Sequence, residues 1–301
     1  MFDQTLGTSG SPIAVTVGHW SDADAATGCT VVLFDRSAQT VVDIRGGAPG
    51  TRETDVLAGD RLIRRADAIA LCGGSAFGLA VADGVMAHLR EQGRGVATAG
   101  GPVPIVPAAV IFDLANRQSF APTAEHGRIA CNAAETLEHL ARGQVGVGTG
   151  ATTDKFTGNG QRGGFGKATV AFGGGSVTAL VVVNAAGAVF DSATNRTVPS
   201  GKEDQRETLL RTPTKLGEGQ ATTLGIVLVD APIDDAGLRR CAIAGHDGYA
   251  RMIRPCHTIF DGDLIFASGL RVGTPSPAEV WVVALATELA VERAILDAVT
   301  A

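Results

Sequence analysis

The sequence predicts an α+β fold built as a single domain over residues 1–301. Strand-like runs of β-branched and apolar residues fall in consecutive pairs toward each end of the chain, and helical periods lie between them without a regular strand–helix–strand alternation. Hydrophobic residues make up 45% of the chain and charged residues 19%, which is typical of a packed globular protein. Aromatic residues make up only 5%, so the core must be built mainly from Ala, Val, Leu and Ile.

The elements can be placed in order along the chain. Runs rich in β-branched residues predict strands at Ile13–Val17, Cys29–Phe34, Val41–Arg45, Ala68–Leu71, Ala168–Phe172, Thr178–Asn184, Leu224–Val229 and Ile259–Ala267. Apolar residues at helical spacing predict helices at Ala76–Glu91, Ala124–Leu140, Ala236–Arg251 and Ala278–Val299. The run Gly173-Gly174-Gly175 between two strands predicts a hairpin turn.

The segment from Ser192 to Gln220 shows no apolar period. It combines proline and glycine with many charged and polar residues, which is typical of an exposed loop that is open to cleavage. It leads directly into the strand that begins near Thr222-Thr223.

Composition narrows the class of protein. The net charge is −6 and no basic cluster occurs, so no nucleic-acid partner is expected. The apolar stretches are shorter than the ~20 residues of a membrane span, and Met1 to Gly10 shows no secretory signal. Five cysteines without a CxxC pair predict free thiols, a cytoplasmic location and no zinc framework.

Ser75 lies in the run Gly73-Gly74-Ser75-Ala76-Phe77, between a predicted strand and a predicted helix. A nucleophile elbow has the pattern G-x-S-x-G, and Phe77 occupies its last position. We therefore interpret Ser75 as a helix cap at a tight turn that could border the substrate pocket. A serine esterase using Ser75 is kept as an alternative.

The run from Gly146 to Ala151 matches the dinucleotide pattern G-x-G-x-x-A. No long strand precedes it and no amphipathic helix follows it, so a loop that approaches another backbone closely is favoured over a cofactor site. No organic cofactor and no metal are expected.

Two histidines and two carboxylates lie near the C-terminal end. No spacing around His246 or His257 matches a metal motif, and both are interpreted as structural. Asp261 and Asp263 are predicted to lie on one face of a strand, in an apolar stretch. They form either a solvated edge or turn at Gly262, or a pair that orients and polarises a nucleophile.

Several stretches together resemble the DmpA family, the L-aminopeptidase/D-esterase and β-peptidyl aminopeptidase group that includes the nylon-oligomer (6-aminohexanoate oligomer) hydrolase. They cover nearly the whole chain in the family's order. The stretches are VGHWSDADAATGCTVVLF (17–34), RGGAPGTRETDVL (45–57), CGGSAFGLAVADGVM (72–86), VPIVPAAVIFDL (103–114), VGVGTGAT (145–152), RGGFGKATV (162–170), VVVNAAG (181–187), TTLGIVLVDA (222–231) and HDGYARMIRPCHTIFDGD (246–263).

This resemblance implies an αββα sandwich of the N-terminal nucleophile hydrolase type. It also implies autocatalytic cleavage between Ala221 and Thr222 into an α fragment, 1–221, and a β fragment, 222–301, with Thr222 as the new N-terminal nucleophile. It further implies an amide or peptide hydrolase, acting on amino-terminal peptides, amino amides or ω-amino acid oligomers, that assembles as a homo-oligomer of tetramer size or larger.

Individual roles carry over by position. Asn184 in VVVNAAG corresponds to the family's oxyanion-stabilising Asn. Lys155 corresponds to a Lys near the nucleophile in the nylon-hydrolase branch, and Asp261 with Asp263 corresponds to the acidic pair of that branch. Once cleavage frees the α-amine of Thr222, its pKa of ~7.7–8.0 would suit it to act as the base for its own hydroxyl.

The chain departs from the family at two positions. Ala221 stands where many relatives have Asn, and Phe112, a candidate pocket residue, stands where relatives often have Tyr. Both departures favour an alternative in which the chain is an uncleaved, inactive relative that only binds a small amine or amide.

Overall fold

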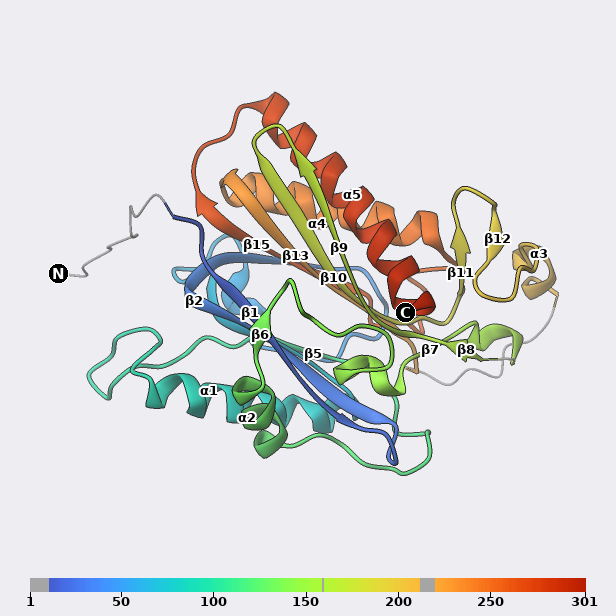
Figure 1. Ribbon diagram of the computed structural model, residues 1–301, viewed down its shortest axis with the longest axis horizontal. Coiled ribbons are helices and arrows are strands. Elements are labelled where there is room, and N and C mark those ends of the chain that lie inside the picture. The colour runs from blue at the N-terminus through green and yellow to red at the C-terminus, as the bar shows by residue number, and fades with distance from the viewer. Residues whose placement is uncertain (1–10, 159, 212–219) are drawn as a thin grey trace.

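The computed structural model describes residues 11–158, 160–211 and 220–301 (Figure 1). Its strands are β1 Val15–Asp22, β2 Thr27–Ile44, β3 Thr51–Arg52, β4 Arg65–Cys72, β5 Ala108–Val110, β6 Glu135–Thr136, β7 Thr152–Thr153, β8 Gln161–Arg162, β9 Gly164–Phe172, β10 Gly175–Asn184, β11 Ala188–Asp191, β12 Arg196–Thr197, β13 Thr222–Ile233, β14 Ile253–Arg254 and β15 Leu264–Val272. Its α-helices are α1 Val81–Glu91, α2 Ala124–Asn132, α3 Arg206–Leu209, α4 Asp235–Met252 and α5 Pro277–Thr300.

Strands and helices form four layers, which confirms the predicted α+β class. Helices α4 and α5 cover one face of the strand system, and α1 and α2 lie over the opposite side (Figure 1). The strands follow the order β3-β5-β4-β2-β15-β13-β10-β9, and β1 pairs with β2. Pairing is antiparallel except for the parallel pairs β13–β15 and β4–β5.

The long strand β2 joins the two sheet layers. Residues Cys29–Leu33 pair with β4, whereas Gln39–Ile44 pair with β15. The register with β4 shifts between Leu33 and Ala38, where the strand passes from one layer to the other. The sequence predicted two separate strands here, because the polar residues Asp35 to Gln39 interrupt the apolar run.

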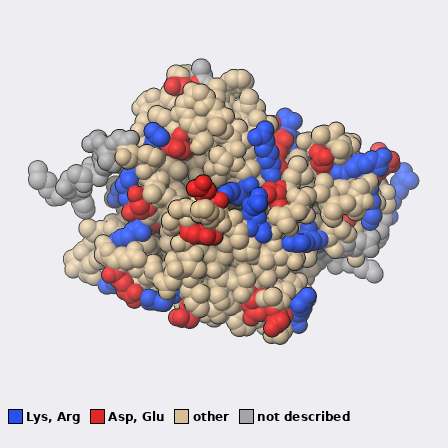
Figure 2. All heavy atoms as spheres, viewed as in Figure 1, with Lys and Arg blue, Asp and Glu red and all other residues tan. Residues whose placement is uncertain are grey.

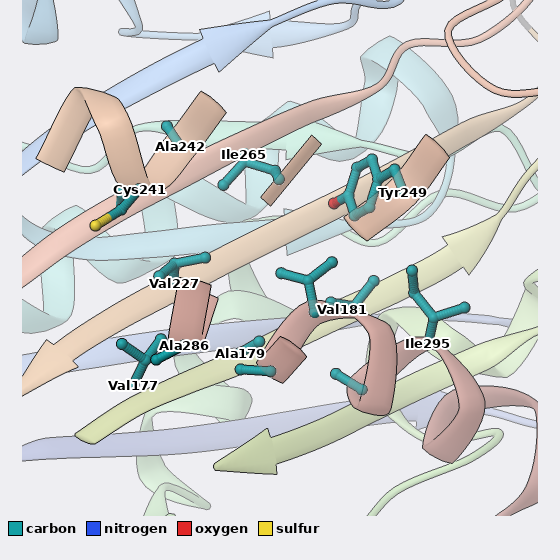
Figure 3. Packing of buried hydrophobic residues seen from close by; sticks show 14 of the residues in the cluster. Val177, Ala179, Val181, Val227, Cys241, Ala242, Tyr249, Ile265, Ala286 and Ile295 are labelled. Atoms are coloured by element: carbon teal, nitrogen blue, oxygen red, sulfur yellow. The ribbon is translucent and has the colours of Figure 1, made fainter. Parts of the chain in front are cut away.

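Three hydrophobic clusters fill the three spaces between the layers, because alternate residues of a strand point to opposite faces. On β10, Val181 and Val183 pack toward α4 and α5, while Leu180 and Val182 pack toward the other sheet. A third cluster joins β2 and β4 to α1 and α2. Figure 3 shows the first cluster, in which side chains from β10, β13 and β15 meet those of α4 and α5.

The two helices over the first cluster begin at polar caps. Asp234 accepts a hydrogen bond from the backbone N–H of Gly237 at the start of α4. Ser276 and Glu279 form a capping box at the start of α5, followed by Pro277 in the first turn. These caps explain why both helices begin within one residue of their predicted starts.

Several element boundaries were predicted wrongly. The helix predicted to begin at Ala76 begins at Val81, because Gly74 in the left-handed region turns the chain into a 3-10 helix over Ser75–Ala80. The helix predicted to reach Leu140 ends at Asn132, after which β6 pairs with β1. The strand predicted over Ile259–Ala267 begins only at Leu264.

The segment Ser192 to Gln220 is partly structured. It contains β12 and the short helix α3, while residues 212–219 lie outside the described residues. The predicted hairpin at Gly173–Gly175 is confirmed, since Phe172 pairs with Gly175 between β9 and β10.

The surface charges, the cysteines and the helices bear on the class of protein that composition predicted. Acidic and basic side chains are intermixed on the face shown in Figure 2. All five cysteines are free. Within the described ranges, no helix has the length and apolar character needed to cross a membrane.

Candidate active site

Thr222 lies at the first position of β13, in the middle of the sheet. Strand register places it directly opposite Asn184, the last residue of β10. Ala221, just before it, forms a parallel bridge with Asp261. Thr222 is 4% exposed, so its hydroxyl lies in a mostly buried setting.

The Ala221–Thr222 peptide bond is intact, and the carbonyl oxygen of Ala221 receives two hydrogen bonds. The hydroxyl of Thr222 donates to it at 2.5 Å, and the backbone N–H of Gly262 donates to it at 2.9 Å. Two donors on one carbonyl oxygen withdraw electron density from its carbon. The hydroxyl next to this carbonyl thus meets a polarised peptide bond.

Only glycine fits at position 262. A Cβ atom there would lie 2.8 Å from the Thr222 hydroxyl oxygen and 2.9 Å from the carbonyl oxygen of Ala48. The loop between Asp261 and Asp263 can therefore approach Thr222 closely only because Gly262 has no side chain.

The side-chain amide of Asn184 is fully buried and fixed by three partners. Its Oδ1 accepts from the backbone N–H of Thr152 at 3.0 Å and from Lys155 Nζ at 2.9 Å. Its Nδ2 donates to the carbonyl oxygen of Phe112 at 3.2 Å. These partners set the orientation of the amide, because Lys155 can only donate and the carbonyl can only accept.

Lys155 links Asn184 to the residue two positions before Thr222. Its Nζ donates to the Asn184 carbonyl at 2.6 Å and to the Gln220 carbonyl at 3.1 Å, besides Asn184 Oδ1. Burial lowers the pKa of Lys155 to about 7, although Asp261, Asp113 and Asp263 act to raise it. The three oxygen acceptors favour the ammonium form, since a neutral amine has only two N–H groups, and they oppose the effect of burial, so Lys155 gains and loses its proton near neutral pH.

Asp263 supports the strand next to Thr222. Its Oδ1 accepts from the backbone N–H of Thr223 at 2.6 Å. Its Oδ2 accepts from the backbone N–H of His257 at 2.9 Å and lies 2.8 Å from that residue's ring Nδ1. Asp263 thus holds the residue after Thr222, whereas the sequence analysis allowed for a carboxylate pair that orients the nucleophile itself.

Asp261 holds the loop instead. It accepts from the backbone N–H and the hydroxyl of Thr258 and from the backbone N–H of Ala186. Burial, with a further contribution from Asp263, raises the pKa of Asp261 to about 6. Both carboxylates lie before β15, outside the strand as the structure has it, so their predicted placement within a strand is wrong, although Asp261 keeps the parallel register of β15 through its bridge with Ala221.

Sequence reasoning missed a third carboxylate. Asp113 is buried and accepts from the Thr27 hydroxyl at 2.7 Å and from the backbone N–H of Gly74 at 2.6 Å. Burial raises the pKa of Asp113 to about 6, against the opposing effects of these hydrogen bonds and of Lys155. Its signal in the sequence was a carboxylate directly after the apolar run that ends at Phe112.

Ser75 and Phe112 lie differently with respect to Thr222. Phe112 reaches the site through its backbone carbonyl on Asn184. Ser75 has positive φ and starts a 3-10 helix, and its side chain caps no helix, so the predicted cap is wrong. Among the described residues, no histidine or carboxylate side chain is hydrogen-bonded to the Ser75 hydroxyl.

A cleft of about 360 Å³ adjoins Asn184 through Thr152, whose backbone N–H contacts the amide. Neither Ser75 nor Phe112 lines it. Its lining includes the polar side chains of Asn116, Arg117, Gln144, Thr149 and Thr152.

The glycine-rich run that begins at Gly146 forms a 3-10 helix, Gly146–Gly150. A Cβ atom on Gly146 would lie 2.3 Å from the Thr30 hydroxyl oxygen. The prediction of a loop in close approach is confirmed, and the run packs on β2 between the two layers.

The family model for peptidase family S58 matches residues 13–301. An uncharacterized aminopeptidase of Mycobacterium tuberculosis is 45% identical over 278 residues, covering 84% of this chain and 78% of the relative. A 6-aminohexanoate-oligomer endohydrolase of an Agromyces species is 30% identical and covers 84% of this chain and 72% of the relative.

Solved structures show the same fold. A β-aminopeptidase of a Burkholderia species superimposes with a TM-score of 0.72 over 95% of this chain and 84% of that one, at 24% identity. The L-aminopeptidase D-Ala-esterase/amidase of Ochrobactrum anthropi, described as a variant of the Ntn hydrolase fold, gives a TM-score of 0.71 over 95% and 83%, at 19% identity. The predicted αββα arrangement and the family resemblance are confirmed, and the chain is a hydrolase that belongs to peptidase family S58.

Proposed function

We propose that this protein is a self-processing amide hydrolase that cleaves its own chain before Thr222 and then uses Thr222 as an N-terminal nucleophile. One observation carries the proposal. The Thr222 hydroxyl lies on the carbonyl oxygen of the peptide bond to be cut, and the Gly262 N–H donates to the same oxygen. The attacking group and a donor for the developing oxyanion are thus already in place.

Self-cleavage would begin as an N-to-O acyl shift. The Thr222 oxygen attacks the Ala221 carbonyl carbon, the carbon–nitrogen bond breaks, and the hydroxyl proton ends on the departing nitrogen. Water then hydrolyses the ester, which leaves a carboxylate on Ala221 and a free hydroxyl and amine on Thr222. An alanine before the cut is compatible with this chemistry, because its side chain takes no part.

Turnover would use the amine that cleavage releases. A free α-amine with a pKa of ~7.7–8.0 can take the proton from the Thr222 hydroxyl as the hydroxyl attacks a substrate amide. Asn184 Nδ2 has two hydrogens, of which one goes to Phe112, so the other is free to hold the substrate oxyanion. Lys155, beside Asn184 and Gln220, would keep the pKa of the amine from rising.

The substrate would carry an amino group near the amide that is cut. We propose amino-terminal peptides, amino amides or ω-amino acid oligomers, because relatives at 45% and 30% identity are named an aminopeptidase and a 6-aminohexanoate-oligomer endohydrolase. The cleft beside Asn184 has a polar lining suited to such a substrate, with Arg117 available for a terminal carboxylate.

The test follows hydrolysis and chain cleavage together. Freshly purified protein is sampled over time, and each sample is assayed on an aminoacyl anilide, an amino amide and a 6-aminohexanoate oligomer. We expect activity to rise in step with the cleaved fraction and to be absent throughout in Thr222→Ala. Binding of an amine or amide by a chain that is never cut and never hydrolyses a substrate would establish the alternative of an inactive binding relative.

A further inference from the structure

Two histidines lie behind Asp263, on the side away from Thr223. His246 comes from α4 and His257 from the loop before β15, and their ring centroids are 4.8 Å apart. Both rings also contact Tyr249. The proposed mechanism uses Asp263 and leaves both histidines unexplained, although sequence reasoning interpreted them as structural.

Hydrogen bonds show, for one nitrogen of each ring, that it carries a hydrogen. His257 Nδ1 lies 2.8 Å from a carboxylate oxygen of Asp263, so Nδ1 carries a hydrogen and donates it. His246 Nε2 lies 3.1 Å from the backbone carbonyl oxygen of Asp43, which can only accept, so Nε2 carries a hydrogen as well.

The other two nitrogens are complementary. His246 Nδ1 and His257 Nε2 are both buried, and neither has a hydrogen-bonding partner among the described residues. Burial lowers the pKa of His246 to about 4, so its Nδ1 is an acceptor. Burial alone would lower the pKa of His257, but hydrogen bonds to Asp263 and Cys256 raise it to about 10, so its Nε2 is a donor.

We propose that His246 and His257 form a buried two-histidine relay that positions Asp263 behind the nucleophile. His246 donates to the Asp43 carbonyl and accepts from His257 Nε2 through one bridging water. His257 donates from Nδ1 to Asp263, whose other oxygen holds the Thr223 N–H. The relay rests on the proposed function only in taking Thr222 as the nucleophile.

The charge of the relay is balanced locally. Protonated His257 faces the Asp263 carboxylate and the Cys256 thiol on its own segment. From α4 it faces neutral His246 and Tyr249, and behind His246 lie Asp43 of β2 and Arg45 just after this strand. A cation held against Asp263 keeps this carboxylate from turning toward other donors, so the backbone at Thr223, and with it Thr222, stays in register.

Matched variants separate the two sides of the relay. His246→Asn keeps an acceptor near the position of Nδ1, whereas His246→Gln keeps a donor toward Asp43 and loses that acceptor. His257→Asn keeps a donor toward Asp263 and suits the left-handed backbone of this residue, at φ 54°, but removes the positive charge. Thermal melting shows which variants are folded.

The experiment reads protonation and cleavage separately. Histidine ring 15N NMR on the full-length Thr222→Ala chain should show His257 doubly protonated at pH 7–8 and His246 neutral with its hydrogen on Nε2. His246→Gln should lower the titration midpoint of His257 and, with Thr222 present, slow self-cleavage by up to about 100-fold. His246→Asn should do less of both.

Two results would overturn the relay: a neutral His257 ring at pH 7, or an unchanged His257 midpoint and normal cleavage in folded His246→Gln. A wild-type chain that never cuts itself would instead reject the proposed function, and the NMR result on the two rings would still stand or fall by itself.

Discussion

Two hydroxyl groups, on Thr222 and on Ser75, sit at comparable junctions and have very different surroundings. Each lies at or near one end of a strand, and each has a closely packed glycine beside it, Gly262 at Thr222 and Gly74 at Ser75. The Thr222 hydroxyl is buried and donates a hydrogen bond to the Ala221 carbonyl oxygen, and Asn184 lies opposite Thr222 in the sheet. Ser75 is half-buried at the start of a 3-10 helix, and no charged side chain among the described residues is bonded to it.

The difference teaches that a nucleophile is defined by its partners. A hydroxyl is a weak nucleophile until a base, an oxyanion donor and a fixed position are supplied. In the proposed mechanism the freed α-amine of Thr222 is the base. The oxyanion donor and the fixed position would come from β10, the loop before β15 and Lys155, which are far apart in the sequence. Around Ser75 the glycines supply only a tight turn, with Gly74 at φ 81°.

The largest expected effect comes from removing the two hydroxyl groups one at a time. Thr222→Ala should abolish both self-cleavage and hydrolysis, because it removes the attacking oxygen, while Ser75→Ala should leave both unchanged. Intact-mass spectrometry and a hydrolysis assay on each folded variant measure this. Loss of activity in Ser75→Ala alone would instead favour the serine-esterase alternative.

The second-largest effect on self-cleavage is expected from removing Asp263, whose carboxylate holds the backbone next to Thr222. In Asp263→Ala the Thr223 N–H loses its acceptor and His257 its counter-charge, so the uncut 301-residue chain should accumulate. Asp230→Ala is the matched control, since Asp230 lies on β13, the strand of Thr223, and among the described residues its ion pair is with Arg271 at the surface. Equal cleavage in the two variants would contradict the role of Asp263.

The oxyanion assignment predicts a smaller, kinetic effect. Asn184→Ala and Asn184→Asp both remove the Nδ2 donor, so each should lower kcat of the processed enzyme by ~10²–10³ with little change in KM. Both variants should also lose stability: Asn184→Ala leaves Lys155 and the Thr152 N–H without their acceptor, and Asn184→Asp turns a carboxylate oxygen toward the Phe112 carbonyl oxygen. Normal kcat in the cut fraction of Asn184→Asp would end the assignment.

The smallest effect is a dependence of stability on pH. The pKa of His257 is raised from 6.5 to about 10, so its contribution to stability is complete below pH 6.5 and is lost as the pH rises toward 10. The pKa of Lys155 is lowered from 10.5 to about 7, so between these values the unfolded chain binds the extra proton and stability rises with pH.

The contributions of His257 and Lys155 change stability with pH in opposite directions, and variants of the two residues separate them. Relative to wild type, Lys155→Met should melt at progressively lower temperature as the pH rises from 7 to 8.5, and His257→Asn at progressively higher temperature. Comparing variants at each pH removes the titration of all other groups. Parallel melting curves for all three proteins would show that neither buried charge is shifted as described.

Most of the fold could be predicted, because apolar periods directly report which face of an element is buried. The four main helices and the paired strands around Thr178–Asn184 and Leu224–Val229 followed from this signal. Predicted boundaries of helices and strands were wrong where the close approach of one backbone segment to another overrides local conformational preference. β15 begins only at Leu264, after the segment in which Gly262 passes close to Thr222, and Gly74 delays the start of α1.

The site was only partly predictable. The family resemblance named Thr222, Asn184, Lys155 and the acidic pair, and the structure brings all five together. Periodicity carries no information on hydrogen bonds between distant segments. The contact of His257 with Asp263, the buried Asp113 and the Gly262 N–H on the Ala221 carbonyl therefore emerged only from the folded arrangement.

The most direct test of the central claim is the intact mass of the purified wild-type chain after incubation, with the new N-terminus sequenced. Cleavage before Thr222 predicts fragments of 221 residues and 301 − 221 = 80 residues, the shorter beginning Thr-Thr-Leu-Gly. The fragments should co-elute under native conditions, because β13, β15, α4 and α5 share the core with β10. A single intact mass in a sample that hydrolyses substrate at full rate would contradict the account.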